Sequence, residues 1–96
     1  MDESNFEWNE AKDLENQRQH GVSFYEAQHA FLDQNRVIAE DLAHSHKEKR
    51  YYCFGLNDKK DGILTVRFTY WSCRIRIFGA GYWRKGKKIY EQANSI

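Results

Sequence analysis

The sequence has no proline and no run of apolar residues long enough to cross a bilayer. A membrane-spanning helix needs about 20 predominantly apolar residues, so this class of protein is excluded. The sequence is also poor in cysteine, with only Cys53 and Cys73, and the two are not spaced as a metal-binding pair. Both lie in predicted strands, and we expect them to be free, buried thiols.

The composition is that of a soluble globular protein. Hydrophobic residues make up 41% and charged residues 30% of the 96 residues, which suits one domain, 1–96, with one modest core. Aromatic residues make up 16%, so we expect much of this core to be aromatic. The acidic, polar stretch 1–6 does not have the pattern of a signal peptide, and we expect a cytoplasmic protein whose residues 1–4 are frayed.

The net charge of +1 conceals a strong asymmetry between the two halves of the chain. Residues 1–48 contain 4 Lys or Arg and 11 Asp or Glu, which gives −7, whereas residues 49–96 contain 11 and 3, which gives +8. A chain of this kind favours an anionic partner for its basic half. The two halves could also pair with each other, or the acidic half could display an acidic helical surface.

Two helices are predicted in the acidic half. The first begins after Asn9, a good N-cap, and ends before Gly21, which suits a left-handed helix stop. The second covers about 24–32, because Ser23 and Glu26 form a capping box at its start.

Period-two alternation and turn residues place the remaining elements. A short extended segment is predicted at 6–8, strands at 37–39, 50–56, 64–70 and 73–78, and a C-terminal helix near 87–93. The predicted fold class is α+β, with two N-terminal helices packed on a four-stranded antiparallel sheet and a short C-terminal helix.

The last two strands form a hairpin that carries the first functional signal. A two-residue loop at 71–72 would pair Phe68 with Ile75 and Arg67 with Arg76, and would place apolar residues on one face. The opposite face would then carry Arg67, Arg74 and Arg76. Guanidinium groups repel one another unless an anion lies between them, and their planar fork suits phosphate. Acidic residues elsewhere in the chain could also pair with them.

The segment after the hairpin adds Trp83, Arg84 and Lys87 within an aromatic and basic run. Cations interleaved with aromatic rings suit a nucleic-acid strand, because they provide charge for the backbone and flat surfaces for the bases.

Several motifs occur in one order along most of the chain. They are F-E-W-N-x-x-K at 6–12, Asn16, H-G-V-S-F-x-E-A at 20–27, Phe31, Asp33, D-x-x-H-S-x-x-E-x-R at 41–50, R-I-R-I at 74–77, and Tyr90-Glu91. Each motif is weak alone, but the set resembles the BrnT family, the toxins of bacterial type II toxin–antitoxin pairs.

The resemblance implies a compact RelE-like fold and a ribonuclease that slows growth by cleaving RNA. It also implies a BrnA-like antitoxin partner, through which the complex would contact DNA and repress its own promoter. One stretch departs from the family: Gly81 stands where an Arg is usual, and the segment up to Tyr90 is one residue shorter. This departure removes a candidate phosphate ligand, which Arg84 could replace from another direction.

Metal-free RNA cleavage needs a base for the ribose 2′-hydroxyl, cations for the charge that builds on phosphorus, and an acid for the leaving 5′-oxygen. We assign the cation role to Arg50 and Arg76. His44 is the first choice for acid or base, and Glu48 is the second. No cofactor or metal is required. The predicted RNA-binding residues are Arg67, Arg74, Trp83, Arg84 and Lys87.

Structural roles for the same residues stay open. His44 could cap a loop, Glu48 could pair with Arg50, and Trp83 could pack rather than stack on a base. A metal pair of His44 and His46 is disfavoured, because no third ligand is placed near them.

Three functions compete. The first is a toxin endoribonuclease, and the second is a module that binds RNA or an acidic antitoxin segment without turnover, as the Gly81 departure would favour. The third is a corepressor that acts only through its DNA-binding partner.

Overall fold

The computed structural model describes residues 5–96, so the expectation for residues 1–4 lies outside it. The elements in chain order are β1 (Phe6–Glu7), α1 (Glu10–His20), α2 (Phe24–Ala27), the 3-10 helix η2 (Gln28–Leu32), β2 (Val37–Glu40), the 3-10 helix η3 (Leu42–His44), β3 (Tyr51–Leu56), β4 (Ile63–Trp71), β5 (Arg74–Gly81) and α3 (Arg84–Ala93). This arrangement confirms the α+β class. No helix within residues 5–96 is long and apolar enough to span a membrane.

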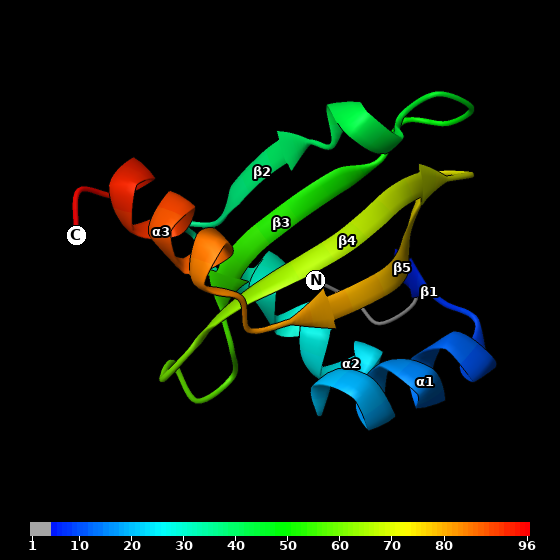
Figure 1. The fold of residues 1–96 in the computed structure, drawn as a ribbon, viewed down its shortest axis with the longest axis horizontal. Helices are drawn as coiled ribbons and strands as arrows, with labels where there is room; N and C mark the ends of the chain where they lie inside the picture. The colour runs from blue at the N-terminus through cyan, green and yellow to red at the C-terminus, as the bar shows by residue number, and fades with distance from the viewer. Residues whose placement is uncertain (1–4) are drawn as a thin grey trace.

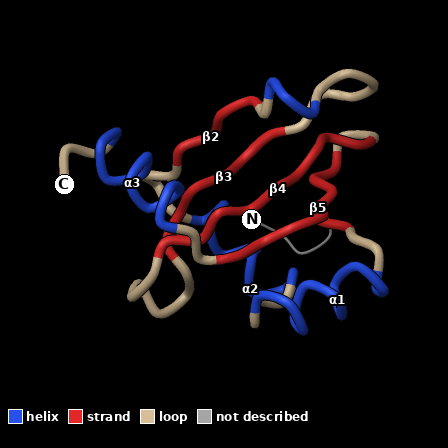
Figure 2. Tube along the Cα trace, in the orientation of Figure 1, coloured by secondary structure: helices blue, strands red, loops and turns tan. Residues whose placement is uncertain are grey.

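The sheet has five strands in the order β1-β5-β4-β3-β2 and is mixed (Figures 1 and 2). The predicted four-stranded antiparallel sheet is therefore wrong in one respect, because β1 adds a parallel edge strand to β5. Phe6 lies opposite Ile75, and Glu7 lies opposite Arg76. The extended segment itself was predicted at 6–8, but its pairing with β5 was not, because the partner residues lie at the other end of the chain.

The hairpin forms with a register different from the predicted one. Phe68 lies opposite Ile77 rather than Ile75, and the two-residue turn is Ser72-Cys73. The φ angles of Ser72 and Cys73 are 50° and 65°, which are the left-handed values of a tight hairpin turn. Because the shift is an even number of residues, the same side chains still face the core. Cys73 is exposed at this turn, so its predicted burial is wrong, whereas Cys53 is buried.

A bulge interrupts the same pair of strands one step further from the turn. Arg67 lies opposite Gly79 rather than Arg76, and the register shifts between Arg67 and Phe68. This leaves Phe78 as the extra residue on β5. Bulges of this kind re-aim side chains next to functional sites, and this one places the Phe78 ring below two arginines.

Helix α1 forms where it was predicted, with the Asn9 side chain accepting a hydrogen bond from Lys12 N and Gly21 in the left-handed conformation with φ 69°. Its inward side is polar, because Asp13 and Asn16 are buried whereas the side chain of Leu14 is exposed. This helix is therefore attached to the protein by hydrogen bonds to backbone groups.

The capping box of Ser23 and Glu26 is present as predicted. The predicted single helix 24–32 consists of one α-helical turn, α2, followed by the 3-10 helix η2. Phe24, Ala27 and Phe31 of this segment are all buried. The hydrophobic core contains residues from β1, the segment before α2, the two helices and the inner face of the sheet: Phe6, Val22, Phe24, Ala27, Ala30, Phe31, Cys53, Leu64, Val66, Phe68, Ile75, Ile77 and Ala80.

The two faces of the sheet are covered differently. Helices α1, α2 and η2 cover the face that carries Phe68 and Ile77. On the opposite face, helix α3 contacts β3 and β4 at one end of the strands. Figure 1 shows the rest of this opposite face open toward the viewer. We call the side opposite the core the open face; it carries Arg67, Thr69 and Phe78.

Helix α3 starts three residues earlier than predicted, at Arg84, and Gly86 lies within it rather than before it. A Cβ at Gly86 would lie 2.0 Å from Thr65 Oγ1 and 3.0 Å from the Phe54 ring. The glycine is therefore the point at which the helix backbone rests on the sheet. Tyr90 of this helix is buried.

Candidate functional site

A cavity of about 140 Å³ lies on the open face, where the start of α1, the end of the loop before β3 and the β4–β5 hairpin meet. It has three basic side chains, Lys12, Arg50 and Arg76, and one acidic side chain, Glu48. The remaining lining residues are Asn9, Thr69, Trp71, Ile77 and Phe78. Three cations and one carboxylate leave an excess of two positive charges. We call this cavity the cationic cleft.

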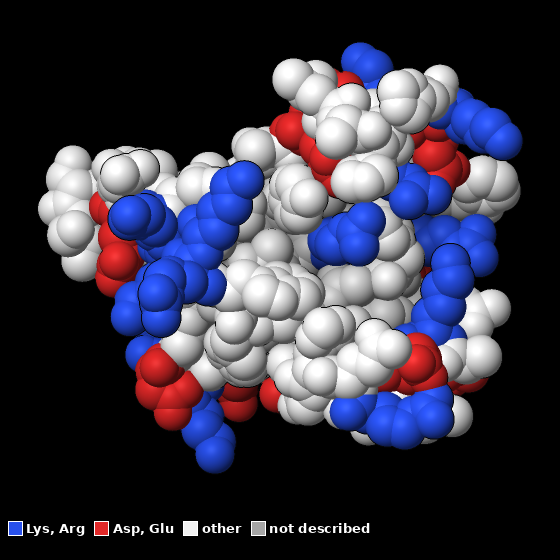
Figure 3. All heavy atoms as spheres, in the orientation of Figure 1, with Lys and Arg blue, Asp and Glu red and all other residues white. Residues whose placement is uncertain are grey.

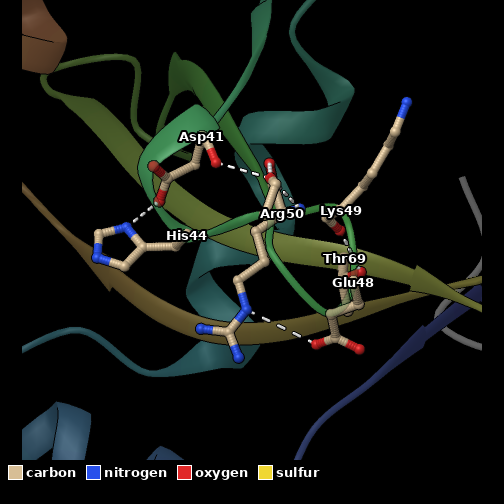
Figure 4. Close-up of polar contacts among 7 residues, drawn as sticks. Asp41, His44, Glu48, Lys49, Arg50 and Thr69 are labelled. Atoms are coloured by element: carbon tan, nitrogen blue, oxygen red, sulfur yellow. Dashed lines mark hydrogen bonds and ion pairs between the residues drawn. The ribbon is translucent and has the colours of Figure 1, made fainter.

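The loop that brings Glu48 and Arg50 to the cleft is held by its own polar groups (Figure 4). Ser45 Oγ donates a 2.7 Å hydrogen bond to Asp41 O and accepts a 3.0 Å hydrogen bond from Arg50 N. The Asp41 backbone N–H donates to Arg50 O at 2.7 Å. Thr69 Oγ1 on β4 donates to Lys49 O at 2.7 Å, which attaches the end of the loop to the sheet. These contacts fix the backbone from which the two side chains extend.

Two guanidinium groups lie over the same aromatic ring. The Arg50 carbon Cζ is 4.7 Å and the Arg67 Cζ is 5.2 Å from the centre of the Phe78 ring. Glu48 lies 3.7 Å from Arg50 Nε. Arg67 Nε is buried and has no hydrogen-bond partner within residues 5–96. The bulge at Phe78 therefore places one ring of β5 under the guanidinium groups of both Arg50 and Arg67.

Asp41 neutralises part of this charge. His44 Nδ1 lies 2.8 Å from Asp41 Oδ2, and the Tyr52 hydroxyl also interacts with this carboxylate. Burial alone would raise the pKa of Asp41, but the hydrogen bonds from His44 and Tyr52 and the charge of Arg67 outweigh it and lower the pKa. Asp41 is therefore ionised at neutral pH and compensates Arg67.

The acidic and basic residues predicted from the sequence are only partly brought together. Glu48, Arg50 and Arg76 line the cleft. His44 is not among the residues that line the cleft. Its side chain is 55% exposed and contacts Asp41. Figure 4 shows the His44 ring on the side of Arg50 away from Glu48. Glu48 pairs with Arg50, as the structural alternative proposed.

Of Arg67, Arg74 and Arg76, which we expected close together on one face, Arg74 has an acidic partner, as the sequence left open. Arg74 donates to Phe6 O at 2.7 Å and lies 3.5 Å from Glu7. It therefore attaches the edge strand β1 to the sheet. Arg76 lies over the Trp71 ring at 5.7 Å, and within residues 5–96 it has no carboxylate partner.

The predicted RNA-binding residues after the hairpin lie apart from the cleft. Trp83 packs against the His20 ring, with ring centres 5.2 Å apart, and occupies the space that a Cβ at Gly81 would need, at 2.7 Å. Arg84 and Lys87 are exposed on α3. Figure 3 shows basic atoms gathered over α3 and, separately, toward the other end of the strands, with mostly uncharged surface between them.

Sequence reasoning missed several residues of the cleft: Asn9, Lys12, Thr69, Trp71 and Phe78. Lys12 belongs to the first turn of a helix whose N-cap was identified, but the parallel pairing of β1 with β5 is what carries that turn to the open face. Trp71 was assigned to a loop. The only available signal was its place in the alternation, since Arg67, Thr69 and Trp71 are two residues apart.

Two larger cavities, of about 510 and 490 Å³, lie around the β3–β4 loop and share His29, Asn57 and Asp58. Their charged residues are mixed, and Asp58 lies 3.5 Å from His29. Within residues 5–96, no three His, Cys, Asp or Glu side chains are arranged to hold a metal ion. We take the smaller cationic cleft as the candidate site, because its lining has an excess of positive charge and the lining of the two larger cavities is mixed.

The fold and the cleft together define a class: a small α+β domain whose sheet carries a cleft with an excess of positive charge. Residues 8–86 match the family described as ribonuclease toxin, BrnT, of type II toxin–antitoxin system. The match covers most of the 96 residues, and the chain belongs to this family. A search of curated proteins found no match. The match to the family confirms the resemblance drawn from the sequence motifs.

Proposed function

We propose that this chain is a metal-independent endoribonuclease, the toxin of a type II toxin–antitoxin pair, and that the cationic cleft is its active site. The observation that carries the proposal is the convergence of Lys12, Arg50 and Arg76 on one cavity that also contains a carboxylate, Glu48. Family membership supports the ribonuclease activity independently of this geometry. The RelE-like fold and the cytoplasmic location implied by the family resemblance belong to the same proposal.

The cleft has the groups that cleavage needs. A base removes the proton of the ribose 2′-hydroxyl, whose oxygen attacks the adjacent phosphorus while the bond to the 5′-oxygen breaks. Lys12, Arg50 and Arg76 would stabilise the additional negative charge on the phosphoryl oxygens. Glu48 is the base that the structure favours over His44, because it lines the cleft. The 5′-oxygen leaves with a proton, for which the Lys12 ammonium, which lines the cleft, is a candidate donor.

Arg67 would support the site from its edge. It shares the Phe78 ring with Arg50 and is already compensated by Asp41. Arg74 has a structural role at β1, and Arg84 and Lys87 would bind the RNA backbone beyond the cleft. The partner would be a BrnA-like antitoxin that covers the cleft, with DNA contacted only through that antitoxin.

The test is cleavage of single-stranded RNA by purified protein in EDTA. We expect Arg76→Ala to lower the cleavage rate at least 100-fold while the far-UV circular dichroism stays that of the wild type. Arg18→Ala is the matched control, since Arg18 is an exposed arginine of α1 outside the cleft. Equal rates for Arg76→Ala and the wild type would exclude the cleft as the active site.

A binding module without turnover is the second candidate, and ion pairing favours it. Glu48 already lies 3.7 Å from Arg50 and is engaged in that ion pair. The Trp83 ring occupies the space beside Gly81, so this position has no room for the arginine that is usual in the family. This candidate predicts RNA binding that weakens steeply with salt but leaves the RNA intact. A corepressor role would instead leave promoter repression unchanged in an Arg50→Ala, Arg76→Ala double variant.

A further inference from the structure

Trp71 is an exposed aromatic residue inside the cationic cleft. It is the last residue of β4, pairs with Arg74 across the hairpin and immediately precedes the Ser72-Cys73 turn. Its side chain lines the cleft, yet 50% of the residue is exposed. Trp71 does not belong to the hydrophobic core. Packing of the core therefore does not explain a half-exposed tryptophan at the edge of a basic cavity.

The cleft contains a second aromatic ring, but that ring is covered. Arg50 and Arg67 both lie over Phe78, at 4.7 and 5.2 Å from its centre. Trp71 has a single guanidinium above it, that of Arg76, at 5.7 Å. Trp71 is therefore the aromatic surface in the cleft that a ligand can still reach.

Trp83, the tryptophan predicted from the sequence to stack on a base, is already packed on His20 and Gly81. Trp71 has the neighbours that a stacking residue needs, because Arg76 and Arg50 line the same cavity. A nucleotide presents a flat base and an anionic phosphate a few ångströms apart. A flat ring beside two guanidinium groups matches both parts at once.

From this geometry we infer that Trp71 is the base-stacking residue of the cleft, and that it positions a single-stranded nucleotide whose phosphate contacts Arg76 and Arg50. The inference rests on the proposed function, since it assigns the RNA of that site a defined place. Stacking accepts any base, so Trp71 contributes affinity and position rather than a strict sequence preference.

The experiment measures binding, at fixed salt, of two 2′-O-methyl oligonucleotides of equal length. One carries bases, and the other carries abasic sugars in the central positions; neither can be cleaved because the 2′-oxygen is blocked. We expect the wild type and Trp71→Phe to bind the base-bearing probe roughly tenfold more tightly than the abasic probe. Trp71→Leu should bind both probes with the weaker affinity.

Tyr70→Leu is the matched control, because Tyr70 is an exposed aromatic residue of the same strand on the opposite side of the sheet. It should retain the wild-type preference for bases. If Trp71→Leu also retains that preference while Arg76→Ala weakens binding of both probes, the stacking role is wrong and the cationic cleft still stands as the RNA-binding site. If Trp71→Leu weakens both probes equally, the residue only supports Arg76, and the inference is wrong.

A failure of the cationic cleft as the proposed site gives a different result. In that case Arg76→Ala binds both probes as the wild type does, since the cleft would not hold phosphate. Such a result would overturn the stacking role together with the proposed site.

Discussion

The hydroxyl of Tyr90 donates a 2.6 Å hydrogen bond to Asp33 Oδ2, and this contact attaches α3 to the segment before β2. The same carboxylate accepts hydrogen bonds from Leu56 N at 2.9 Å and Asn35 N at 2.8 Å. Burial alone would raise the pKa of Asp33, but these hydrogen bonds lower it below its ordinary value of 3.8. Burial, together with the Asp33 carboxylate, raises the pKa of Tyr90 to about 12.

Tyr90→Phe should therefore reduce the free energy of unfolding by about 1 kcal/mol at pH 7. A lowered carboxylate pKa stabilises the fold above pH 4, and this contribution is lost as the pH falls through the folded pKa. A raised phenol pKa stabilises it below pH 10, and this contribution is lost as the pH rises toward 12. Urea unfolding should show the difference between wild type and variant shrinking at both extremes. Tyr70→Phe, which removes an exposed hydroxyl, should show no such pH dependence.

Asn16 attaches α1 to the sheet, and its loss should be costly. Its side-chain amide donates to Val22 O at 2.8 Å and Ala80 O at 2.9 Å, and its carbonyl accepts from Ala80 N at 3.2 Å. Asn16→Ala leaves these buried backbone groups unpaired, so we expect a loss of about 3 kcal/mol in the free energy of unfolding. Gln19→Ala on the exposed side of the same helix should change it by less than about 0.5 kcal/mol. Equal effects would show that α1 is not held by this residue.

The contrast between α1 and α2 shows what sequence reasoning can reach. Capping residues act on their neighbours in the chain, so Asn9, Gly21, Ser23 and Glu26 predicted the correct helix starts and stop. The inward side of α1 was not predictable from apolar periodicity, because Asn16 is buried by bonding to a strand 64 residues away. The same limit applies to β1, whose only partner is β5.

The cleft was predictable to the extent that it depends on alternation along single strands. Arg50, Glu48 and Arg76 were identified from motifs, and all three line it. The bulge that brings Arg67 over Phe78 depends on cross-strand register, and one sequence gives no direct signal for register. The sequence left open whether Trp83 packs or stacks on a base, because its packing on Gly81 requires the end of β5 and the start of α3 to be known.

Gly86→Ala tests whether the close approach of α3 to the sheet outweighs the higher helix propensity of alanine. In an isolated helix alanine would be favoured by about 1 kcal/mol. Here the new Cβ would lie 2.0 Å from Thr65 Oγ1, so α3 must move from the sheet, and we expect a net loss of about 2 kcal/mol in thermal or urea unfolding. Lys88→Ala in the same helix, at an exposed position, should be nearly neutral. A stabilised Gly86→Ala variant would contradict the contact of α3 with β4.

The two cysteines should react very differently with a thiol reagent. Cys73 is exposed at the hairpin turn, whereas Cys53 is buried, and burial raises the pKa of its thiol to about 12. The thiolate is the reactive form, so one equivalent of reagent should add rapidly to the native protein at pH 8, at Cys73, and a second only after unfolding. Cys73→Ser should abolish the fast phase, and mass spectrometry of peptides would locate each adduct. Fast labelling of Cys53 would contradict its place in the core.

The choice between Glu48 and His44 as the base can be made by substituting each residue. Glu48 lines the cleft beside Arg50, whereas His44 is bound to Asp41 and lies outside the lining. A missing general base costs about 100-fold or more in rate, so Glu48→Gln, which keeps the size of the side chain, should lower the cleavage rate by this amount while RNA binding is retained. His44→Ala should lower the rate less than about tenfold. A larger loss in His44→Ala than in Glu48→Gln would move proton transfer to the Asp41–His44 pair and leave Glu48 only its ion pair with Arg50.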